Sequence, residues 1–195
     1  MHEPRFHKQP ALLLMYRTLH NLRFIEQNKC HTGPFEVTQL INSFLAVLAH
    51  PWDQLLDKKK LAVLKLNDPA FVEYGFPTLS LLPFEGAPKS IATAEDLLGT
   101  VRNGMAHGNI ELLNRAEFQA LRPHDPLPKV KEKEIAGLKL WNYKYRTTTM
   151  NWCTVISIYE MKQMLQAMRN LCEDRDLWRP EHAHLDVSGV ADISA

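Results

Sequence analysis

Apolar residues recur at helical spacing in four stretches of the chain. Because an α-helix turns 100° per residue, positions three, four and seven apart share one side and can face a core. Each stretch therefore predicts one amphipathic helix. The four stripes are Leu12, Met15, Leu19, Leu22 and Ile25; Val37, Ile41, Phe44 and Leu48; Leu97, Leu98, Val101 and Met105; and Ile158, Met161, Leu165, Met168 and Leu171.

Capping and helix-breaking residues set the expected ends of these helices. Pro10 opens the first, and Pro51 ends the second, because the residue before a proline avoids helical geometry. Thr93 and Asp96 have the spacing of a capping box, and Gly108 stands where a left-handed residue usually ends a helix. The expected helices cover 10–28, 35–50, 93–107 and a segment that Ser157 caps through Glu160.

The segments between the helices follow other patterns. Strands are expected at 110–113, 135–145 and 152–156, and a polar stretch at 114–133 joins the first two. Residues 52–66 predict one or two short helical pieces, with the lysines at 58–60 on a solvated face. Prolines and glycines predict an irregular excursion over 67–90, with a loop over the functional site as one role for it.

These elements predict a mostly α fold, with four main helices and a small β insert between the third and fourth. The insert covers about 110–156. A single domain is expected over 1–178, because a hairpin alone cannot bury a core of its own. The tail at 179–195 has no convincing periodicity and is expected to be mobile.

Composition narrows the class of protein. The chain has 195 residues, of which 45% are hydrophobic and 23% charged, and this is ordinary for a globular domain. A net charge of +1 means that a nucleic-acid surface would have to be a local patch. Three scattered cysteines argue against a disulfide framework and a cysteine zinc site. With neither a secretory leader nor an apolar run that could span a bilayer, we expect a cytoplasmic protein.

The third helix carries the candidate chemistry. An arginine followed by a histidine is weak as a bare pattern, since 175–182 and 179–184 also satisfy it, but both of those straddle a proline. Arg102 and His107 instead lie on a capped helix, and Asn103 shares the His107 side. Asp96 and Thr100 extend this polar stripe along the helix. A glycine inside a helix is costly, so Gly104 suggests a close neighbour.

Residues 101–110, which read VRNGMAHGNI, resemble the HEPN superfamily (higher eukaryotes and prokaryotes nucleotide-binding domain). Its Arg-polar-x3-His signature is matched by Arg102, Asn103 and His107. The similarity extends through INSFL at 41–45 and LKLWN at 138–142 towards a plasmid-associated HEPN subfamily. The resemblance implies a four-helix up-and-down bundle and a metal-independent endoribonuclease with no cofactor. Such proteins often act in toxin–antitoxin, antiphage or other conflict systems, commonly as homodimers, with RNA and a cognate antitoxin or regulatory protein as partners.

The residue chemistry is consistent with RNA cleavage. His107 offers a base for the 2′-OH proton, Arg102 a cation for the phosphorane, and Asn103 a group to orient the imidazole or a phosphate oxygen. Two other interpretations stand beside catalysis. A helix-terminal histidine is often only a dipole partner, and a HEPN-like domain can keep its motif as a module that binds RNA, a nucleotide or a protein. Neutralisation through a modified tyrosine is disfavoured, because Asn109, Ile110 and Glu111 follow the motif.

Residues 129–146 form the most basic stretch, with six basic against two acidic residues. Within it, Lys139, Lys144, Arg146 and Trp141 are the candidate RNA-binding residues. The interleaved Trp141, Tyr143 and Tyr145 suit stacking on unpaired bases, although alternating aromatics also suit a half-buried strand. No metal site is expected, because the histidines at 182 and 184 lack an evident third ligand.

A homodimer is also expected, because the motif supplies one histidine per chain whereas cleavage uses a proton acceptor and benefits from a proton donor. In this arrangement the polar stripe of the third helix lines a two-fold cleft. Gly99 and Ala106 are small enough to let the partner helix approach.

Overall fold

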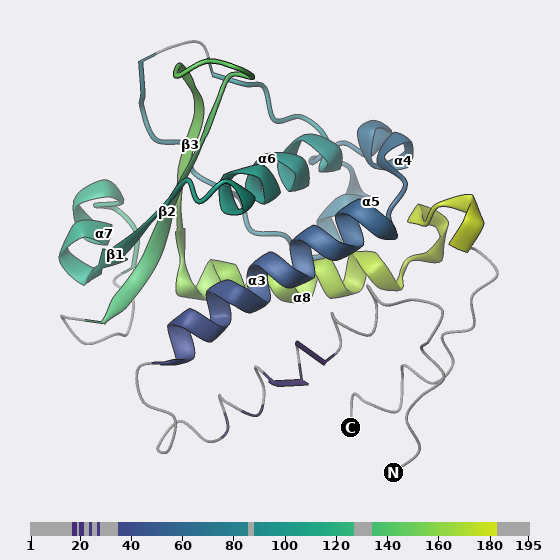
Figure 1. The fold of residues 1–195 in the computed structure, drawn as a ribbon, viewed down its shortest axis with the longest axis horizontal. Coiled ribbons are helices and arrows are strands. Elements are labelled where there is room, and N and C mark those ends of the chain that lie inside the picture. Colours follow the sequence, from purple (N-terminus) through teal and green to yellow (C-terminus); the bar gives the residue numbers. More distant parts are fainter. Residues whose placement is uncertain are drawn as a thin grey trace.

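Three long helices and a small sheet enclose the main core of the protein (Figure 1). The computed structural model describes residues 17–18, 20–21, 24, 27, 35–85, 88–126 and 134–182. The elements are α3 (Phe35–Gln54), α4 (Lys58–Val63), α5 (Pro69–Val72), α6 (Ala94–Ala106), β1 (Ile110–Asn114), α7 (Arg115–Leu121), β2 (Ile135–Tyr143), β3 (Met150–Ser157) and α8 (Ile158–Glu173), followed by 3-10 turns at Arg175–Leu177 and Pro180–His182. The fold is mostly α, as expected. Most of the predicted helix at 10–28 lies outside the described residues, and the described positions within it are helical.

Helix α3 is longer than expected, because Pro51 lies inside it rather than at its end. The next turn continues past the proline, where the amides of Leu55 and Leu56 both donate to the Pro51 carbonyl at 2.9 Å. Trp52, Leu55 and Leu56 are buried in the core. Burial of these large side chains outweighs the amide hydrogen bond that a proline cannot make. The extra turn matters for the site, because it carries Asp53.

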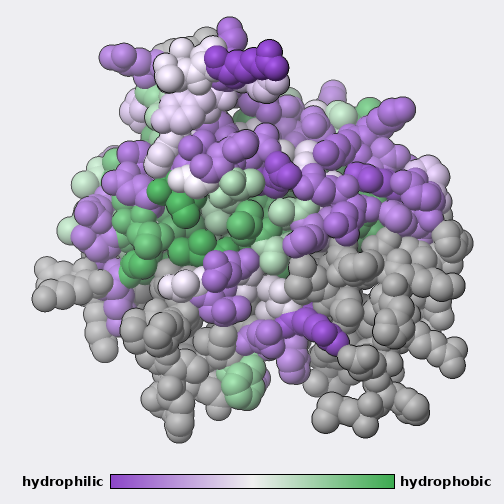
Figure 2. Space-filling view, in the orientation of Figure 1, coloured by the Kyte–Doolittle hydropathy of each residue, from purple (hydrophilic) through white to green (hydrophobic). Residues whose placement is uncertain are grey.

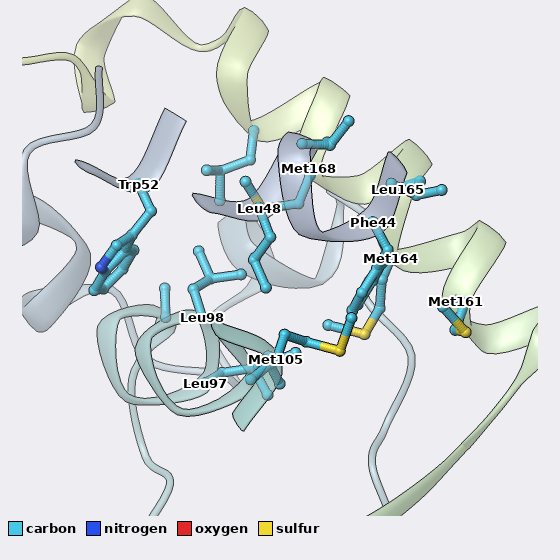
Figure 3. Close-up of a cluster of buried hydrophobic side chains, with 14 of the residues drawn as sticks. Phe44, Leu48, Trp52, Leu97, Leu98, Met105, Met161, Met164, Leu165 and Met168 are labelled. Carbon is cyan, nitrogen blue, oxygen red and sulfur yellow. The ribbon is translucent and has the colours of Figure 1, made fainter. Parts of the chain in front are cut away.

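Helix α6 crosses between α3 and the sheet. Leu97, Leu98 and Met105 point towards Phe44 and Leu48 of α3, and the methionine-rich face of α8 closes the same core (Figure 3). Its other buried side packs on β2. A Cβ added at Gly104 would lie 3.2 Å from the Trp141 carbonyl oxygen, so a strand backbone is the close neighbour that this glycine predicted.

The sheet has the antiparallel order β1-β2-β3. All three predicted strands are present, with β2 ending at Tyr143 and β3 beginning at Met150. The stretch at 114–133 contains a helix that the sequence analysis missed, α7. Asn114 and Glu117 form its capping box, and Phe118 is buried against the sheet. The Asn-x-x-Glu spacing before an apolar residue was a usable signal for this helix.

The excursion at 67–90 is irregular apart from the single turn of α5, and part of it follows the edge of β3. The Leu82 amide donates to the Cys153 carbonyl at 2.9 Å, and the Lys89 amide donates to the Asn151 carbonyl at 2.7 Å. This segment therefore covers what would otherwise be an open sheet edge.

The chain beyond α8 returns to the end of α3 (Figure 1). Trp178 is buried in the main core, and the Arg179 amide donates to the Leu55 carbonyl at 3.0 Å. Lys60 belongs to this junction, since its ammonium group donates to the carbonyls of Asp176 and Trp178 at 2.5 and 3.1 Å. The lysines at 58–60 are thus not simply a solvated face. The division of the domain at 178 stays a prediction.

Candidate functional site

Both ends of α6 are closed by specific hydrogen bonds, and these fix the Arg102–His107 segment. At the N-terminus, the capping box of Thr93 and Asp96 is present in both directions. At the C-terminus, His107 is the capping residue and Gly108 has a φ of 68°. The amides of Gly108 and Asn109 donate to the carbonyls of Met105 and Gly104 at 3.1 and 2.9 Å, which is a Schellman motif. The capping signals predicted from the sequence are confirmed.

Arg102 extends from α6 towards the last turn of α3. Its Nη2 lies 2.6 Å from the Asp53 carboxylate, and its Nη1 donates to the Asn103 side-chain oxygen at 3.1 Å. The side chain is 27% exposed, so the guanidinium group is held at the surface rather than enclosed. Its Nε is buried without a hydrogen-bond partner. The contact between Asp53 and Arg102 was missed, because residues 49 positions apart carry no local sequence signal.

His107 and Asn103 are both exposed at the C-terminal end of α6. Asn103 accepts a hydrogen bond from Arg102, so in this structure it orients the guanidinium group rather than the imidazole. Arg102 and His107 are five positions apart, which on an ideal α-helix corresponds to about 140° around the axis and about 7.5 Å along it. The two side chains therefore leave one helix in different directions.

The polar stripe of α6 is only partly open, and this corrects the expected dimer cleft. Thr100 is buried, with its hydroxyl accepting from the Lys89 ammonium group at 2.9 Å and its carbonyl accepting from the Asn142 amide at 2.5 Å. Lys89 also lies 3.7 Å from the Asp96 carboxylate. The excursion thus packs on the N-terminal half of the stripe, where Thr100 is buried and Asp96 is half-buried, whereas Asn103 and His107 at the other end are exposed.

Gly99 does not leave room for a partner helix. A Cβ at this position would lie 3.1 Å from the ring of Trp52 in the same chain, so the glycine accommodates an internal aromatic side chain. Ala106 is exposed, as the dimer hypothesis required. A bulky substitution at Gly99 would therefore disturb the core and could not serve as a test of dimer formation.

The pKa shifts of buried ionisable groups indicate which of these groups have a structural rather than a chemical role. Burial opposes the ionisation of Asp96, but hydrogen bonds from Thr93 and Ala92 and the charge of Lys89 outweigh it, and they hold the pKa of this carboxyl below its usual value. Burial also raises the thiol pKa of both Cys153 and Cys172. Neither of these two cysteines is suited to nucleophilic chemistry.

The candidate RNA-binding residues lie along β2 and the turn that follows it. Lys139, Trp141 and Tyr143 alternate with the buried Leu138, Leu140 and Asn142, so they share the outward side of the strand. The Trp141 indole donates to the Tyr143 hydroxyl at 3.1 Å. Lys139 lies 3.1 Å from the Glu111 carboxylate on β1, so part of its charge is already compensated.

The β2–β3 turn carries the other two candidates. Lys144 and Arg146 are exposed, and the Arg146 guanidinium group lies 5.1 Å from the centre of the Tyr145 ring. In Figure 2 this turn forms the projection at the top of the molecule, where a few strongly hydrophilic side chains lie among others of near-neutral hydropathy. A backbone hydrogen bond connects β2 to the end of α6. The Trp141 amide donates to the carbonyl of Asn109, two residues after His107.

Two further properties bear on function. Among the described residues, no group of three or more His, Cys, Asp or Glu side chains is arranged to hold a metal ion. No helix within the described part of the chain is long and apolar enough to cross a membrane. The pair of histidines at 182 and 184 lies partly outside the described residues.

Comparison with known proteins identifies one family. The model of the family HEPN pEK499 p136 matches residues 1–177, which is most of the chain. No curated protein and no solved structure gave a significant match.

Proposed function

Because the chain belongs to the HEPN pEK499 p136 family, we propose that it is a metal-independent endoribonuclease with Arg102 and His107 as its catalytic pair. A HEPN family suggests a nucleotide-binding or ribonuclease-type function. The observation that carries the finer proposal is the geometry of α6. Arg102 lies at the surface, where oxygen acceptors of Asp53 and Asn103 orient its guanidinium group. The exposed His107 lies at the end of the same helix.

The reaction proposed is transesterification at a phosphodiester of RNA. His107 takes the proton from the 2′-hydroxyl, and the 2′-oxygen attacks phosphorus while the bond from phosphorus to the 5′-oxygen breaks. Arg102 stabilises the negative charge on the non-bridging oxygens as the phosphorane forms. The products are a 2′,3′-cyclic phosphate and a 5′-hydroxyl. Asn103 keeps the guanidinium group in place through its side-chain oxygen.

The departing 5′-oxygen benefits from a proton donor, and we propose that a second copy of the chain supplies it in a homodimer. An apolar surface lies beside the open end of α6, over α3 and the adjoining strands (Figure 2). Ile41 and Leu45 of α3 and Ile110 of β1 are partly exposed, and Leu112 of β1 is 47% exposed. Such a surface next to His107 supports an interface there.

We propose that RNA reaches this site along the outward side of β2. Lys144 and Arg146 would contact phosphates and Trp141 would stack on a base, with a smaller contribution from Lys139 because of its ion pair with Glu111. A helix over 10–28 would complete a four-helix up-and-down bundle. The biological role proposed is that of a cytoplasmic toxin or antiphage effector, controlled by a cognate antitoxin or regulatory protein.

The alternative is a non-catalytic HEPN-like module that binds RNA, a nucleotide or a protein. The contact that favours it is the Arg102–Asp53 ion pair, which compensates the positive charge that catalysis would use. The two functions predict different outcomes for bound RNA, because an endoribonuclease cleaves it whereas a binding module leaves it intact.

The deciding experiment incubates RNA with the purified protein in EDTA and identifies the chemical ends of any fragments. We expect cyclic phosphate and 5′-hydroxyl ends, and no cleavage by Arg102→Ala or His107→Ala proteins that remain folded. His124→Ala, at another exposed histidine, is the control and should cleave normally. Cleavage that needs added metal, or that survives the His107 change, would reject the mechanism. RNA bound but left intact would favour the module.

A further inference from the structure

Asp53 is the carboxylate that meets the proposed catalytic arginine. Its Oδ2 lies 2.6 Å from Nη2 of Arg102, and its Oδ1 lies 3.8 Å from the Lys58 ammonium group. Lys58 is held separately over the ring of Trp52, 4.9 Å from its centre. The much shorter distance makes Arg102 the principal partner of Asp53.

The backbone at Asp53 is itself fixed by the returning C-terminal segment. The Arg179 guanidinium group donates to the Asp53 carbonyl at 2.6 Å and to the Leu56 carbonyl at 3.2 Å. The His182 ring lies 2.7 Å from the Gln54 carbonyl. These bonds engage the carbonyls of Asp53 and Gln54 in the last turn of α3, which have no partner within the helix, and that of Leu56 just beyond it. Asp53 is therefore a rigid point from which a side chain on α6 can be oriented.

The two contacts of Arg102 leave its guanidinium group little rotational freedom. Asp53 binds one terminal nitrogen and Asn103 the other, so the plane of the group is set by residues on two different helices. The pair is partly exposed, and exposed ion pairs contribute little to stability because solvent screens them and ordering two side chains costs entropy. The main effect of the Asp53–Arg102 contact is therefore to orient the guanidinium group rather than to stabilise the fold.

We propose that Asp53 is a positioning residue, whose carboxylate fixes the Arg102 guanidinium group in the orientation that meets the scissile phosphate of RNA. This inference rests on the proposed ribonuclease function of Arg102. The carboxylate has a second, opposite effect, because its negative charge repels a phosphate. The sign of the effect on the rate therefore distinguishes positioning from simple charge compensation.

The test compares the kinetics of Asp53→Asn and Asp53→Glu with those of the wild type. The asparagine keeps an oxygen acceptor but loses the charge. We expect kcat to fall by about 10- to 100-fold with little change in KM, because misplacing a group that acts in the transition state lowers kcat. Asp53→Glu should recover part of the loss. Lys58→Gln, which removes the other cation near Asp53, should leave kcat unchanged. A kcat for Asp53→Asn at or above the wild-type value overturns the inference.

A second measurement does not depend on activity. In NMR spectra of nitrogen-labelled protein, a guanidinium group held at both terminal nitrogens should give resolved NH signals for Arg102, assigned by comparison with Arg102→Lys. Loss of these signals in Asp53→Asn, with an unchanged melting temperature, supports positioning. Signals that persist in this variant overturn it.

The two readouts separate this inference from the proposed function. If the wild type cleaves no RNA, the ribonuclease proposal fails, and the NMR comparison alone decides whether Asp53 fixes the orientation of the Arg102 guanidinium group. If the wild type cleaves and Asp53→Asn loses neither rate nor signals, only the inference about Asp53 fails. A fall in kcat together with a lowered melting temperature would indicate a structural role and also overturn it.

Discussion

The backbone conformation of Gly108 decides where α6 ends and therefore how His107 is presented. Its φ of 68° is left-handed, and the Schellman hydrogen bonds depend on it. A Cβ at this position would meet nothing within 4 Å. Substitution there isolates a backbone effect, because no side-chain clash accompanies it.

We expect Gly108→Val to lower the free energy of unfolding by about 1–2 kcal/mol, the cost of a left-handed conformation for a residue with a Cβ. Gly108→Asn should lose much less, because asparagine tolerates this region. Urea unfolding measures both. The valine protein should also cleave RNA more slowly, since His107 adjoins the distorted turn. Equal stability of the two variants would show that the chain can leave α6 by another path.

The residue-scale features that could be predicted were those with a local cause. The capping box, the left-handed Gly108 and the close neighbour of Gly104 each follow from a few adjacent residues and are confirmed. The pairing of Asp53 with Arg102 could not be predicted. It depends on how far α3 continues and on how two helices cross, and neither is encoded near Arg102.

Elements were predicted well where a periodic stripe coincided with a capping signal, as in α6 and α8. The end of α3 was wrong, because proline preference is a local term that burial of Trp52 outweighs. The course of the 67–90 excursion also escaped prediction. Its position is set by pairing with the edge of β3, and a sequence pattern does not reveal which edge a segment will follow.

The N-terminus of α6 should give a pH-dependent contribution to stability. The pKa of Asp96 is lower in the folded protein than its ordinary value of about 3.9. A carboxyl with a depressed folded pKa stabilises the protein above its unfolded pKa, and this stabilisation is lost as the pH falls through the folded pKa.

We therefore expect Asp96→Asn to lower the free energy of unfolding by about 0.5–1 kcal/mol at pH 7. The difference from wild type should shrink as the pH falls below about 4. Glu95→Gln is the control, because Glu95 lies in the same turn but outside the capping box, and it should change stability little. Denaturant unfolding across the pH range measures both. A difference that is the same at pH 7 and at pH 3 would exclude the ionised capping interaction.

The β2–β3 hairpin should set the salt dependence of RNA binding. We expect Lys144→Gln and Arg146→Gln, each in the cleavage-deficient His107→Ala protein, to reduce the log–log salt slope for single-stranded RNA by about 0.7 per lost phosphate contact. Lys139→Gln should reduce it less, because Glu111 already compensates this lysine. Lys59→Gln, at an exposed lysine of α4, is the control. Slopes unchanged in the hairpin variants would place the RNA elsewhere.

For the whole molecule, the mostly α class and the insertion of strands before the last helix followed from the sequence, because hydrophobic period distinguishes the two kinds of element. Whether the polar stripe of α6 faces a partner chain could not be predicted from the sequence. Lys89 donates a hydrogen bond to Thr100, and the Trp52 ring lies against Gly99. Residues of the same chain therefore already pack against the N-terminal half of α6. Any shared site must be built at the other end of α6, beside the apolar surface of α3 and β1.

We expect Leu112→Arg to dissociate the proposed homodimer and to abolish cleavage while the chain stays folded. Leu112 is 47% exposed, so a charged side chain can remain in solvent in the monomer but would be buried in the interface. Val63→Arg is the matched control, because Val63 is 77% exposed on α4 and should leave assembly unchanged. Light scattering measures the mass. An active monomer would exclude a shared site.

Mixing two inactive proteins tests how a dimer would divide the catalytic pair. Arg102 and His107 leave α6 about 140° apart, so one substrate phosphate is more readily reached by Arg102 of one protomer and His107 of the other. In a heterodimer of Arg102→Ala and His107→Ala chains, one of the two shared sites then has an intact arginine and an intact histidine, and the other has neither. We expect cleavage to return when the inactive proteins are exchanged into heterodimers, but at less than half the wild-type rate per dimer, because the heterodimer keeps one histidine as the base and lacks the second histidine that would serve as proton donor. If both residues act within one protomer, each site in the heterodimer lacks one of them and no activity returns. Adding Leu112→Arg to both chains should prevent the recovery, which ties it to assembly rather than to residual activity of either variant.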